Sequence, residues 1–581
     1  MIEKMTQYSF VLLEKEKEGF LEELSDLGVM DITRSTKPID ERSAEMLGRA
    51  DTLKRRIALL ERGDWKQDGE YASLLERKTE AERDYADRLP WGDVDEARMA
   101  ELERSGIRFH YYIIPEKKYD PAWEESYVTR IACQQDEKIW LVVAVPEGTP
   151  VGIPFKEVPR PTGTLAEAKE RIAEMADAVA ARSTVLNAER DSLPAMKADY
   201  VGRMHDLDLY WAEAAGENAA ENHLTVFVGY APTEHDRELQ ARLDELGHFY
   251  LTAPATAADN PPIKLKNNPF TRQFETLTDM YGRPDYDEFD PTPYISVFFL
   301  LFFAMCMGDA GYGLLLIVIG QLLRKSEGMK SLSPLVTILG VGTFLIGIVM
   351  HTFFGYDIST LEWLPSWMKS VMITGTIGGF EAQMVLALAI GIVHLCLAMV
   401  VKTVYATRNK GFLGSLGTWG WTLLIVGGVI LAALGMAKLV PAATLKWIVI
   451  GLGILSALGI FLFNDIHRNP LKNIGSGLWE TYNTVTGLLG DVLSYLRLYA
   501  LGLAGGMLGK AFNDIAAMTL GDGSFGFGWL FFVLILIVGH ALNLAMCCLG
   551  AFVHPLRLNF LEFFKNSGYD GKGRKYAPLQ K

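Results

Sequence analysis

The chain has 581 residues, of which 49% are hydrophobic, and its formal net charge is −14. Residues 1–293 contain 37 of the 56 Lys+Arg and 58 of the 70 Asp+Glu, so this half is strongly acidic. Residues 294–581 contain the other 19 Lys+Arg and 12 Asp+Glu. The acidic first half argues against a nucleic-acid partner and fits either the docking of basic partners or an ordinary solvated surface. The five cysteines include no CxxC pair, which argues against a disulfide framework and a zinc site.

The first 290 residues predict a cytoplasmic arm. The N-terminal MIEKMTQYSF lacks the apolar core of a secretory signal, so we expect this half to stay in a reducing cytoplasm. Two outer pieces, 1–35 and 222–256, each have a strand–helix–strand pattern and are expected to form one α/β lobe. Residues 105–155 contain β-rich runs and are expected to form a second lobe.

Helical heptads in residues 40–90 and 164–217 predict two long helices with one apolar seam each. These helices would pair as an antiparallel coiled-coil hairpin and join the two lobes into a dumbbell. The alternative is a pair of unrelated small domains. No phosphate-binding loop, nucleophile elbow or HExxH motif occurs, so the arm is expected to be a connector and not an enzyme, and no cofactor is expected.

Residues 291–581 predict an α-helical membrane domain, because apolar runs approach the ~20 residues that cross a bilayer. The last two runs exceed one crossing, so those helices must tilt or project beyond the bilayer. We expect about eight spans, at 293–307, 310–323, 333–354, 383–405, 416–436, 443–463, 477–517 and 526–565.

Loop charges predict that both termini are cytoplasmic, because basic residues concentrate on the side that eight spans would place inside. The outer connections carry only Lys369, Lys438, Lys446 and Lys510. The inner connections and tail carry Arg324, Lys325, Lys330, Lys402, Arg408, Lys410, Arg468, Lys472 and the basic segment NSGYDGKGRKYAPLQK.

Arg497 stands in GDVLSYLRLYALGLAGGML, a run that is otherwise mostly apolar, small or aromatic. An arginine near a bilayer centre costs about 2.5–3.5 kcal/mol on insertion scales. Helical steps of three or four residues lead from it toward the inner surface along one face. These steps pass Ser494, Asp491, Gly487, Thr484 or Asn483, and Glu480.

A second polar stripe follows the last span and approaches its arginine from the outer side. Its members are His540, Asn543, Cys547, Gly550, His554 and Arg557. The two stripes suggest two aqueous half-paths that do not join. Each polar residue taken singly is also explained by helix packing or hydrogen bonding, and Asp491 or Glu480 by pairing with Arg497. Asp309 is interpreted as a turn residue at a membrane edge.

Four long motifs resemble the membrane stator subunit of rotary V-type and A-type ATPases, called subunit I or subunit a. SYLRLYALGLA (494–504) is similar to the first arginine motif of that family and HPLRLNFLEFF (554–564) to the second. DMYGRPDYDEFDPTPYISVFFLLFFAMCMGDAGYG (279–313) resembles the entry into its first span, and GHALNLAM (539–546) also fits. Family members have a dumbbell-like cytoplasmic half before eight spans, so the resemblance covers the whole architecture.

The resemblance implies a stator beside a rotating ring of small membrane subunits, each with an ion-binding carboxylate. Arg497 would meet that carboxylate in its charged form, and Arg557 would assist. Peripheral stalks would hold the cytoplasmic lobes, a central-stalk cap subunit would lie nearby, and ATP would be hydrolysed or made on other subunits. Ion translocation, of H⁺ or Na⁺, is expected to involve Arg497, Arg557, Asp491, Glu480, Ser494, His540, Asn543 and His554.

The sequence departs from eukaryotic relatives at Gly505, where they have a histidine, and at Cys547, where they tend to have a glutamate. The outer half-path therefore need not use the same groups. The short form and the loop charges favour the plasma membrane of a prokaryote. Two other classes stay open: a self-contained secondary ion transporter, and a membrane scaffold in which Arg497 only pairs within the chain.

Overall fold

The computed structural model describes the chain except residues 36, 94, 161, 220–222, 363, 464–469, 521–526 and 581. Arg468, residue 222 and the first residue of the last predicted span, 526, therefore lie outside the described residues. The chain forms two compact units. Unit 1 comprises Met1–Glu16, Leu27–Ile32 and Glu217–Leu579, and unit 2 comprises Lys17–Asp26, Thr33–Gly216 and Gln580–Lys581.

Unit 1 contains an antiparallel sheet built from both outer pieces of the arm sequence. Its strand order is β2–β7–β1–β8, with β6 also paired to β7. The predicted strand–helix–strand order of both pieces is confirmed, with β1 and β2 flanking α1 (Lys17–Leu27), and β7 and β8 flanking α8 (Asp236–Leu246). The strands are β1 (Met5–Leu13), β2 (Asp31–Ile32), β6 (Glu217–Ala219), β7 (Leu224–Pro232) and β8 (Tyr250–Pro254).

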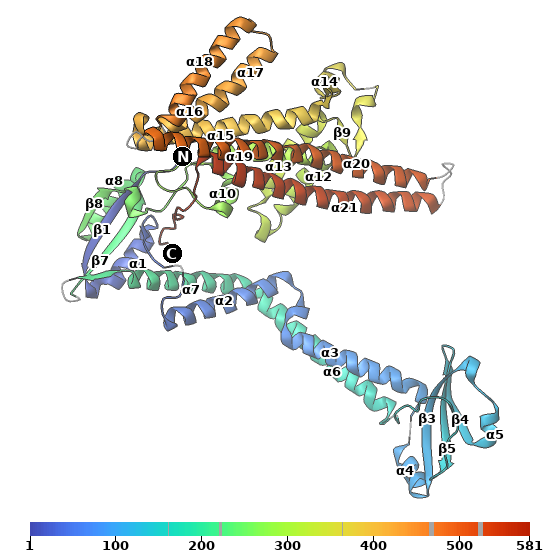
Figure 1. Cartoon of the computed structure of the whole chain (residues 1–581). Helices are drawn as coiled ribbons and strands as arrows, with labels where there is room; N and C mark the ends of the chain where they lie inside the picture. The colour runs from blue at the N-terminus through green and yellow to red at the C-terminus, as the bar shows by residue number, and fades with distance from the viewer. Residues whose placement is uncertain are drawn as a thin grey trace. The chain divides into compact units, whose positions relative to one another are not determined.

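The rest of unit 1 is mostly helical (Figure 1), and most of its long helices are apolar. Two short helices, α9 (Pro269–Arg272) and α10 (Glu275–Tyr281), precede the apolar ones. These are α11 (Thr292–Met307), α12 (Ala310–Leu323), α13 (Ser333–Val349), α15 (Ala382–Gly414), α16 (Leu416–Thr422), α17 (Gly428–Met436), α18 (Ala442–Phe461), α19 (Pro470–Ser494), α20 (Leu496–Met518) and α21 (Phe527–Arg557). A short helix, α22 (Phe564–Ser567), follows them.

Five helical segments are long and apolar enough to cross a membrane, and three shorter apolar helices, α11 to α13, precede them. The five are 382–414, 416–436, 442–462, 471–518 and 528–567, the last two with 48 and 40 residues. Each predicted span therefore contains a helix, whereas the count of eight crossings stays a prediction. The predicted span 333–354 is too long, because α13 ends at Val349 and a hairpin of β9 (Thr352–Phe353) and β10 (Tyr356–Asp357) follows. Between that hairpin and α15 lie α14 (Ser366–Val371) and a second hairpin, β11 (Thr376–Ile377) with β12 (Phe380–Glu381).

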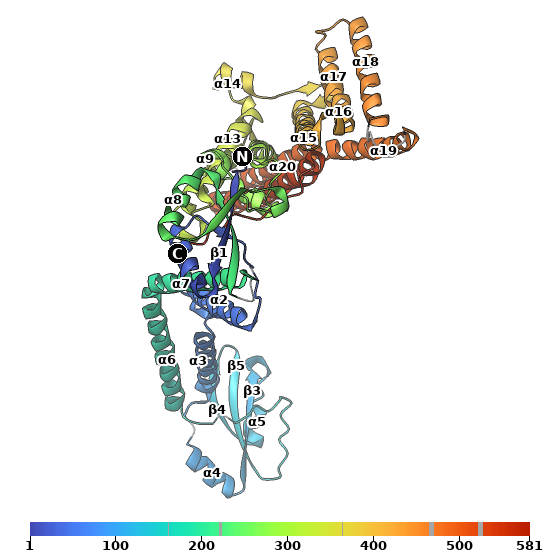
Figure 2. The ribbon, with the colours of Figure 1, turned by 90° about the vertical axis from the view of Figure 1, so that its left-hand side faces the viewer.

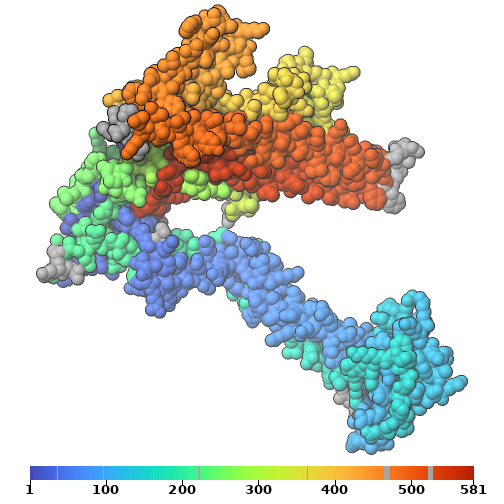
Figure 3. Space-filling model, viewed as in Figure 1, coloured from blue at the N-terminus to red at the C-terminus, as the bar shows by residue number. Residues whose placement is uncertain are grey.

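A buried core joins α11, α12, α13, α15, α20 and α21, and its members include Phe299, Phe302, Tyr312 and Tyr495. Glycines allow close approach here: a Cβ on Gly347 would lie 2.1 Å from the backbone N of Ala310. The helices α17 and α18 pair with each other and project from the other apolar helices (Figures 2 and 3), although α18 also contacts α19.

Unit 2 contains two pairs of helices and a small sheet. Helix α2 (Glu41–Arg62) contacts α7 (Leu193–Ala214), and α3 (Gly69–Arg88) contacts α6 (Leu165–Asp191). The antiparallel sheet has the order β3–β5–β4, and whether the helix pairs form a true coiled coil stays a prediction, as do the predicted domain boundaries. The sheet region comprises α4 (Glu96–Arg104), β3 (Ile107–Pro115), α5 (Ala122–Ser126), β4 (Val128–Gln135) and β5 (Lys138–Pro146).

Each predicted arm helix is broken once, which the heptads did not reveal. The first breaks after Arg62, where Gly63 takes a left-handed conformation with φ 68° and Asp68 caps α3 by accepting from the Tyr71 N–H. The second breaks at Ser192, after which Pro194 occupies the first turn of α7. Capping and proline therefore set the ends of these four helices.

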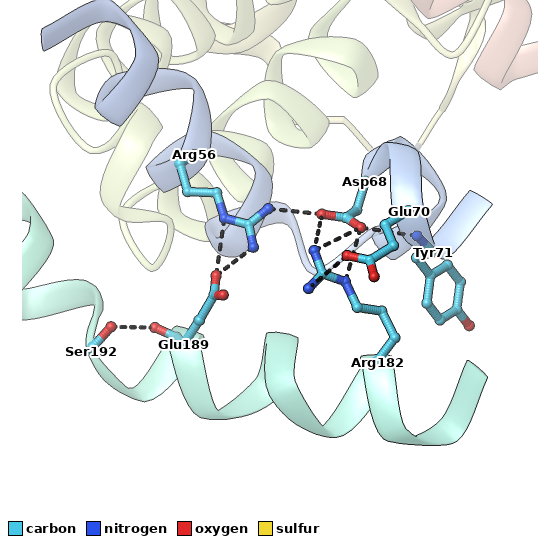
Figure 4. A network of polar contacts seen from close by, with 7 residues as sticks. All are labelled: Arg56, Asp68, Glu70, Tyr71, Arg182, Glu189 and Ser192. Atoms are coloured by element: carbon cyan, nitrogen blue, oxygen red, sulfur yellow. Dashed lines mark hydrogen bonds and ion pairs between the residues drawn. The ribbon is translucent and has the colours of Figure 1, made fainter. Parts of the chain in front are cut away.

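Ion pairs join the two breaks (Figure 4). The Asp68 carboxylate accepts from Arg56 at 2.8 Å and from Arg182 at 3.1 Å, and Arg56 also pairs with Glu189 at 2.5 Å. Burial alone would raise the pKa of Asp68, but the Tyr71 N–H and the two guanidinium groups outweigh it and hold that pKa well below its usual range. Asp68 thus both caps α3 and ties it to α2 and α6.

Replacing Asp68 separates these two roles. Asp68→Asn keeps an oxygen for the cap but removes the charge, and we expect it to destabilise α3 and α6 by about 2–3 kcal/mol, because two arginines lose their shared partner in a mostly buried site. Asp68→Ala also loses the cap and should cost about 1 kcal/mol more. Hydrogen exchange of α3 and α6 in the full chain measures both, with Glu45→Gln in the exposed Arg49–Glu45 pair as a control that should change little.

The same site predicts an acid-dependent weakening. Because the folded pKa of Asp68 lies below the unfolded value of about 3.9, its stabilisation is fully present above that pH and is lost as the pH falls below about 4. The protection of the α3 and α6 amides against hydrogen exchange, corrected for intrinsic exchange rates, should decline below about pH 4 in the unchanged chain. It should decline less in Asp68→Asn. Equal declines in both would contradict this role.

Candidate functional site

Arg497 lies two residues after a break between two helices. Helix α19 ends at Ser494, α20 begins at Leu496, and Tyr495 between them is fully buried. The Tyr495 ring lies against Gly391 of α15, where a Cβ would come within 2.3 Å of it, and its hydroxyl is 2.9 Å from His394 Nδ1. These contacts fix the start of α20 and with it the position of Arg497.

The Arg497 guanidinium has a buried nitrogen, Nη1, without a hydrogen-bond partner among the described residues. It lies within electrostatic range of His554 in α21 and Cys306 in α11. No ion pair joins Arg497 to a carboxylate in the described part of the chain, where Asp491 instead contacts Lys565 at 3.5 Å. The expected intramolecular counter-ion is therefore engaged elsewhere.

Polar residues gather on the side of Arg497 that the loop charges predict to face the cytoplasm, where α19 meets residues 562–566. Asp491 accepts from Asn566 Nδ2 at 2.8 Å, and Ser494 donates to the Gly490 carbonyl and lies at the Glu562 carboxyl. Glu480, the farthest member of the predicted lane, is partly exposed on α19 and lies about 25 Å along the helix from Arg497. The structure thus brings Asp491 and Ser494 together with Glu562 and Asn566, and leaves Glu480 apart.

On the side of Arg497 that is predicted to face outward, His540 and Asn543 join α21 to α12 and α20. His540 Nδ1 is 2.8 Å from the Tyr312 hydroxyl, and its Nε2 is 2.9 Å from Asn513 Oδ1. Asn543 Nδ2 donates to the Tyr312 hydroxyl at 2.8 Å and to the Gly505 carbonyl at 2.9 Å.

The donor pattern of this outer network fixes one tautomer of His540. Asn513 Nδ2 donates to the Phe354 carbonyl at 2.6 Å, so its Oδ1 is free to accept from His540 Nε2–H. His540 Nδ1 then accepts from the Tyr312 hydroxyl, whose oxygen accepts from Asn543. The neutral imidazole therefore satisfies every partner in the chain of bonds.

Cys547 continues the outer stripe next to Asn543. Its Sγ lies 3.4 Å from Asn543 Oδ1, and a Cβ on Gly505 would lie 2.7 Å from that sulfur. The two positions at which the sequence departs from eukaryotic relatives therefore face each other. A larger side chain at Gly505 would have to displace Cys547.

The polar stripe predicted on α21 does not stay on one helix face as far as Arg557. His554 is partly buried and its Nδ1 has no hydrogen-bond partner among the described residues, but Arg557 is exposed. A π-helical turn, Leu558–Phe563, follows directly. The buried polar positions in this turn are Asn559 and Glu562, so the turn moves the polar face away from Arg557.

Asp309 is a turn residue, as the sequence predicts, but it is buried. Its carboxylate caps α12 by accepting from the Gly311 and Tyr312 N–H groups and also accepts from Phe354 and Gly355 of the following hairpin at 2.9 and 2.8 Å. Four backbone donors thus hold one carboxylate. This cap places Tyr312 where it meets His540.

Sequence reasoning missed Tyr312, Asn513, Asn559, Glu562 and Asn566 as members of these polar groups. A usable signal existed for the amides and for Glu562, since polar residues within apolar helices are rare and usually have partners. Tyr312 gave little signal because a tyrosine in an apolar helix is ordinary. No cluster of three or more His, Cys, Asp or Glu side chains suited to a metal occurs in the described ranges.

Comparison with known proteins gives a consistent result. The family model for the V-type ATPase 116kDa subunit family matches residues 209–349 and 479–581, which include Asp309, Arg497 and Arg557. The A-type ATP synthase subunit I of Methanocaldococcus jannaschii is 32% identical over 365 residues, 58% of this chain and 51% of that protein. The chain is therefore similar to subunit I of V-type and A-type ATPases.

Other relatives extend the match. The A-type ATP synthase subunit I of Pyrococcus abyssi is 34% identical over 55% of this chain and 48% of its own length. The V-type ATP synthase subunit I 1 of Treponema pallidum is 25% identical over 84% of this chain and 81% of that protein. The chain thus spans about half the length of the archaeal subunit I relatives it matches. Its long apolar helices and these relatives indicate a membrane-embedded protein.

The outer network predicts a specific loss of stability. Asn543→Ala removes two donated hydrogen bonds and leaves the buried Gly505 carbonyl and the Tyr312 hydroxyl short of a partner. We expect a cost of about 1–2 kcal/mol, since hydrogen bonds between membrane helices contribute about 0.6–2 kcal/mol each.

Thermal unfolding of the detergent-solubilised complex, followed by loss of native α20–α21 contacts in hydrogen exchange, measures this effect. Leu542→Ala, at a neighbouring exposed position on α21, is the matched control and should shift stability less. A larger effect at Leu542 than at Asn543 would argue against the network.

Proposed function

We propose that this chain is the stator subunit of a V/A-type rotary ATPase and that it forms two ion half-paths beside the rotor ring. The single observation that carries the proposal is Arg497: a permanent charge in an apolar helix, with a buried nitrogen and no carboxylate ion pair in the described part of its own chain. The match to the V-type ATPase 116kDa subunit family supports the same role. The chain would carry no ATP site, and ATP would be hydrolysed or made on other subunits.

The chemistry requires an arginine in this position. A ring carboxylate crosses lipid when neutral, but its charged form carries a large desolvation cost unless it is paired. Arg497 would supply that partner and lower the proton affinity of the carboxylate, which favours release of the ion into one half-path. A guanidinium does not deprotonate in proteins and so cannot carry the ion itself, whereas a buried lysine can lose its proton.

The polar groups on either side of Arg497 fit two separate half-paths. Asp491 and Ser494 lie on the inner side, and His540, Asn543 and Cys547 lie on the outer side. Arg557 is exposed on α21 and would face a partner subunit. His554 lies within electrostatic range of both Arg497 and Arg557. The conducted ion is H⁺ or Na⁺, a choice set largely by ligands on the ring.

The proposal also names partners and location. The ring of small membrane subunits would contact α19 to α21, and the cytoplasmic lobes would bind peripheral stalk subunits and approach the central-stalk cap. The protein would lie in the plasma membrane of a prokaryote with both termini in the cytoplasm, as the loop charges favour.

A self-contained secondary transporter is the alternative of a different class. It would transport ions in liposomes as the isolated chain, whereas a stator requires the ring and stalk subunits and should co-purify with them. The scaffold alternative assigned Asp491 or Glu480 to Arg497 as its counter-ion. Asp491 contacts Asn566 and Lys565, and Glu480 lies about 25 Å along the helix from Arg497. This favours a partner for Arg497 on another subunit.

The test is Arg497→Ala in the assembled complex, with ATP-driven ion uptake into vesicles as the measurement. We expect uptake to fall about a hundredfold or more, because a buried charge without its partner costs about 3–5 kcal/mol and each 1.4 kcal/mol is a factor of ten. Arg497→Lys should restore only part of the uptake.

Lys446→Ala removes an exposed positive charge from α18 and is the matched control, with normal uptake expected. Subunit content is checked by gel for each variant. Normal uptake by Arg497→Ala in an intact complex would make this arginine structural and would refute the proposed mechanism.

A further inference from the structure

The end of α21 carries two buried polar side chains that the mechanism above does not use. Asn559 has no exposed surface and Glu562 is 3% exposed. Both lie in the π-helical turn Leu558–Phe563, a type of turn that is frequent at functional sites. A carboxyl group is costly to bury in an apolar helix bundle and usually has a function there.

The Glu562 carboxyl faces the inner polar lane. Ser494, one helical turn before Arg497, is its side-chain hydrogen-bonding neighbour, and Asp491 lies within electrostatic range. Asn566 connects the two segments, because its Nδ2 donates both to Asp491 at 2.8 Å and to the Glu562 carbonyl at 2.6 Å. Glu562 therefore lies between the Asp491 end of the lane and the Arg497 end.

Several buried polar atoms near this line have no hydrogen-bond partner among the described residues. They are Glu562 Oε2, Asn559 Oδ1, His554 Nδ1 and Arg497 Nη1. Leaving such atoms unsatisfied costs about 1–3 kcal/mol each, and proteins normally satisfy them with ordered water. Their succession from Glu562 to Arg497 is the pattern expected of a hydrated path.

A purely structural role for Glu562 is less consistent with its surroundings. A buried structural carboxylate is normally paired. Arg557 lies within electrostatic range of Glu562, but its side chain is exposed and no ion pair joins the two in the described residues. Lys565 reaches Asp491 instead. The other titratable group facing Glu562 is Tyr495, whose hydroxyl is bonded to His394.

We propose that Glu562 is the proton-relay carboxyl of the inner half-path, placed between Asp491 and Arg497. This inference rests on the proposed stator function. In each transfer, the Glu562 carboxylate accepts one proton from a water molecule on the Asp491 side, and that water takes up a replacement proton from the solution at the entrance of the half-path. Glu562 then gives its proton to a water molecule on the Arg497 side, which passes a proton to the ring carboxylate, so that Glu562 returns to the carboxylate and only O–H bonds form and break.

The test uses Glu562→Gln and Glu562→Asp in the assembled complex, with proton uptake into vesicles measured across pH in H₂O and D₂O. Glu562→Gln keeps the shape but cannot relay a proton, so uptake should fall about a hundredfold, the contribution typical of a positioned proton-transfer group. Glu562→Asp should retain uptake with a shifted pH profile. Its H₂O/D₂O rate ratio should rise, because its shorter side chain makes proton transfer the slow step.

The matched control is Asp514→Asn, which removes an exposed carboxylate from α20 and should change neither the rate nor the isotope ratio. Normal uptake by Glu562→Gln overturns the relay. If that variant fails to assemble, Glu562→Asp decides, and an unchanged pH profile and isotope ratio overturn the relay. Uptake of Na⁺ in place of protons by the unchanged complex also overturns it.

The two proposals fail in different ways. If Arg497→Ala is inactive while Glu562→Gln is normal, only the relay is wrong and the stator function stands. If Arg497→Ala transports normally, the stator mechanism is wrong whatever Glu562 does.

Discussion

A permanently charged guanidinium inside an apolar helix is the constraint on which the membrane unit depends. The cost of placing Arg497 there, about 2.5–3.5 kcal/mol, must be offset by a partner, and Asp491 contacts Asn566 and Lys565 instead. The surrounding structure is built to hold this residue in place. Tyr495 is packed against Gly391 and bonded to His394 at the start of α20, so the charge is fixed by α15 before any other subunit is considered.

The polar groups on the two sides of Arg497 differ in their chemistry. The outer group is a closed set of hydrogen bonds in which Tyr312, Asn513, His540 and Asn543 satisfy one another. The inner group leaves Glu562 Oε2 and Asn559 Oδ1 without partners among the described residues. A hydrogen-bonded network of side chains holds its members rigidly. Buried polar atoms without a protein partner are normally hydrogen-bonded to water. This asymmetry suits a site that holds its outer side rigid and moves protons on its inner side.

Much of the fold could be predicted from local sequence patterns. Alternation predicted the paired strands β1 and β7, and apolar length predicted the membrane helices, because both signals depend on neighbouring residues. The arm breaks at Gly63 and Ser192 and the π-helical turn at Leu558–Phe563 depend on contacts made elsewhere. For the same reason, a prediction based on a constant 3.6-residue period placed Arg557 on the polar stripe and missed Glu562. The same spacing was sufficient to place Asp491, Ser494, His540 and Asn543 on polar helix faces.

The most direct measurement is chemical cross-linking between position 497 and the ring in the assembled complex, after replacement of the five native cysteines. Arg497→Cys is combined with a cysteine at the ring carboxylate and a short bifunctional thiol reagent, because an arginine–carboxylate pair spans more than the ~6.8 Å between Cα atoms that a disulfide bridges. The account predicts a covalent product with the ring subunit that stops ATP-driven transport, and none from Ile454→Cys on exposed α18. An assembled complex without that product would contradict the pairing of Arg497 with the ring.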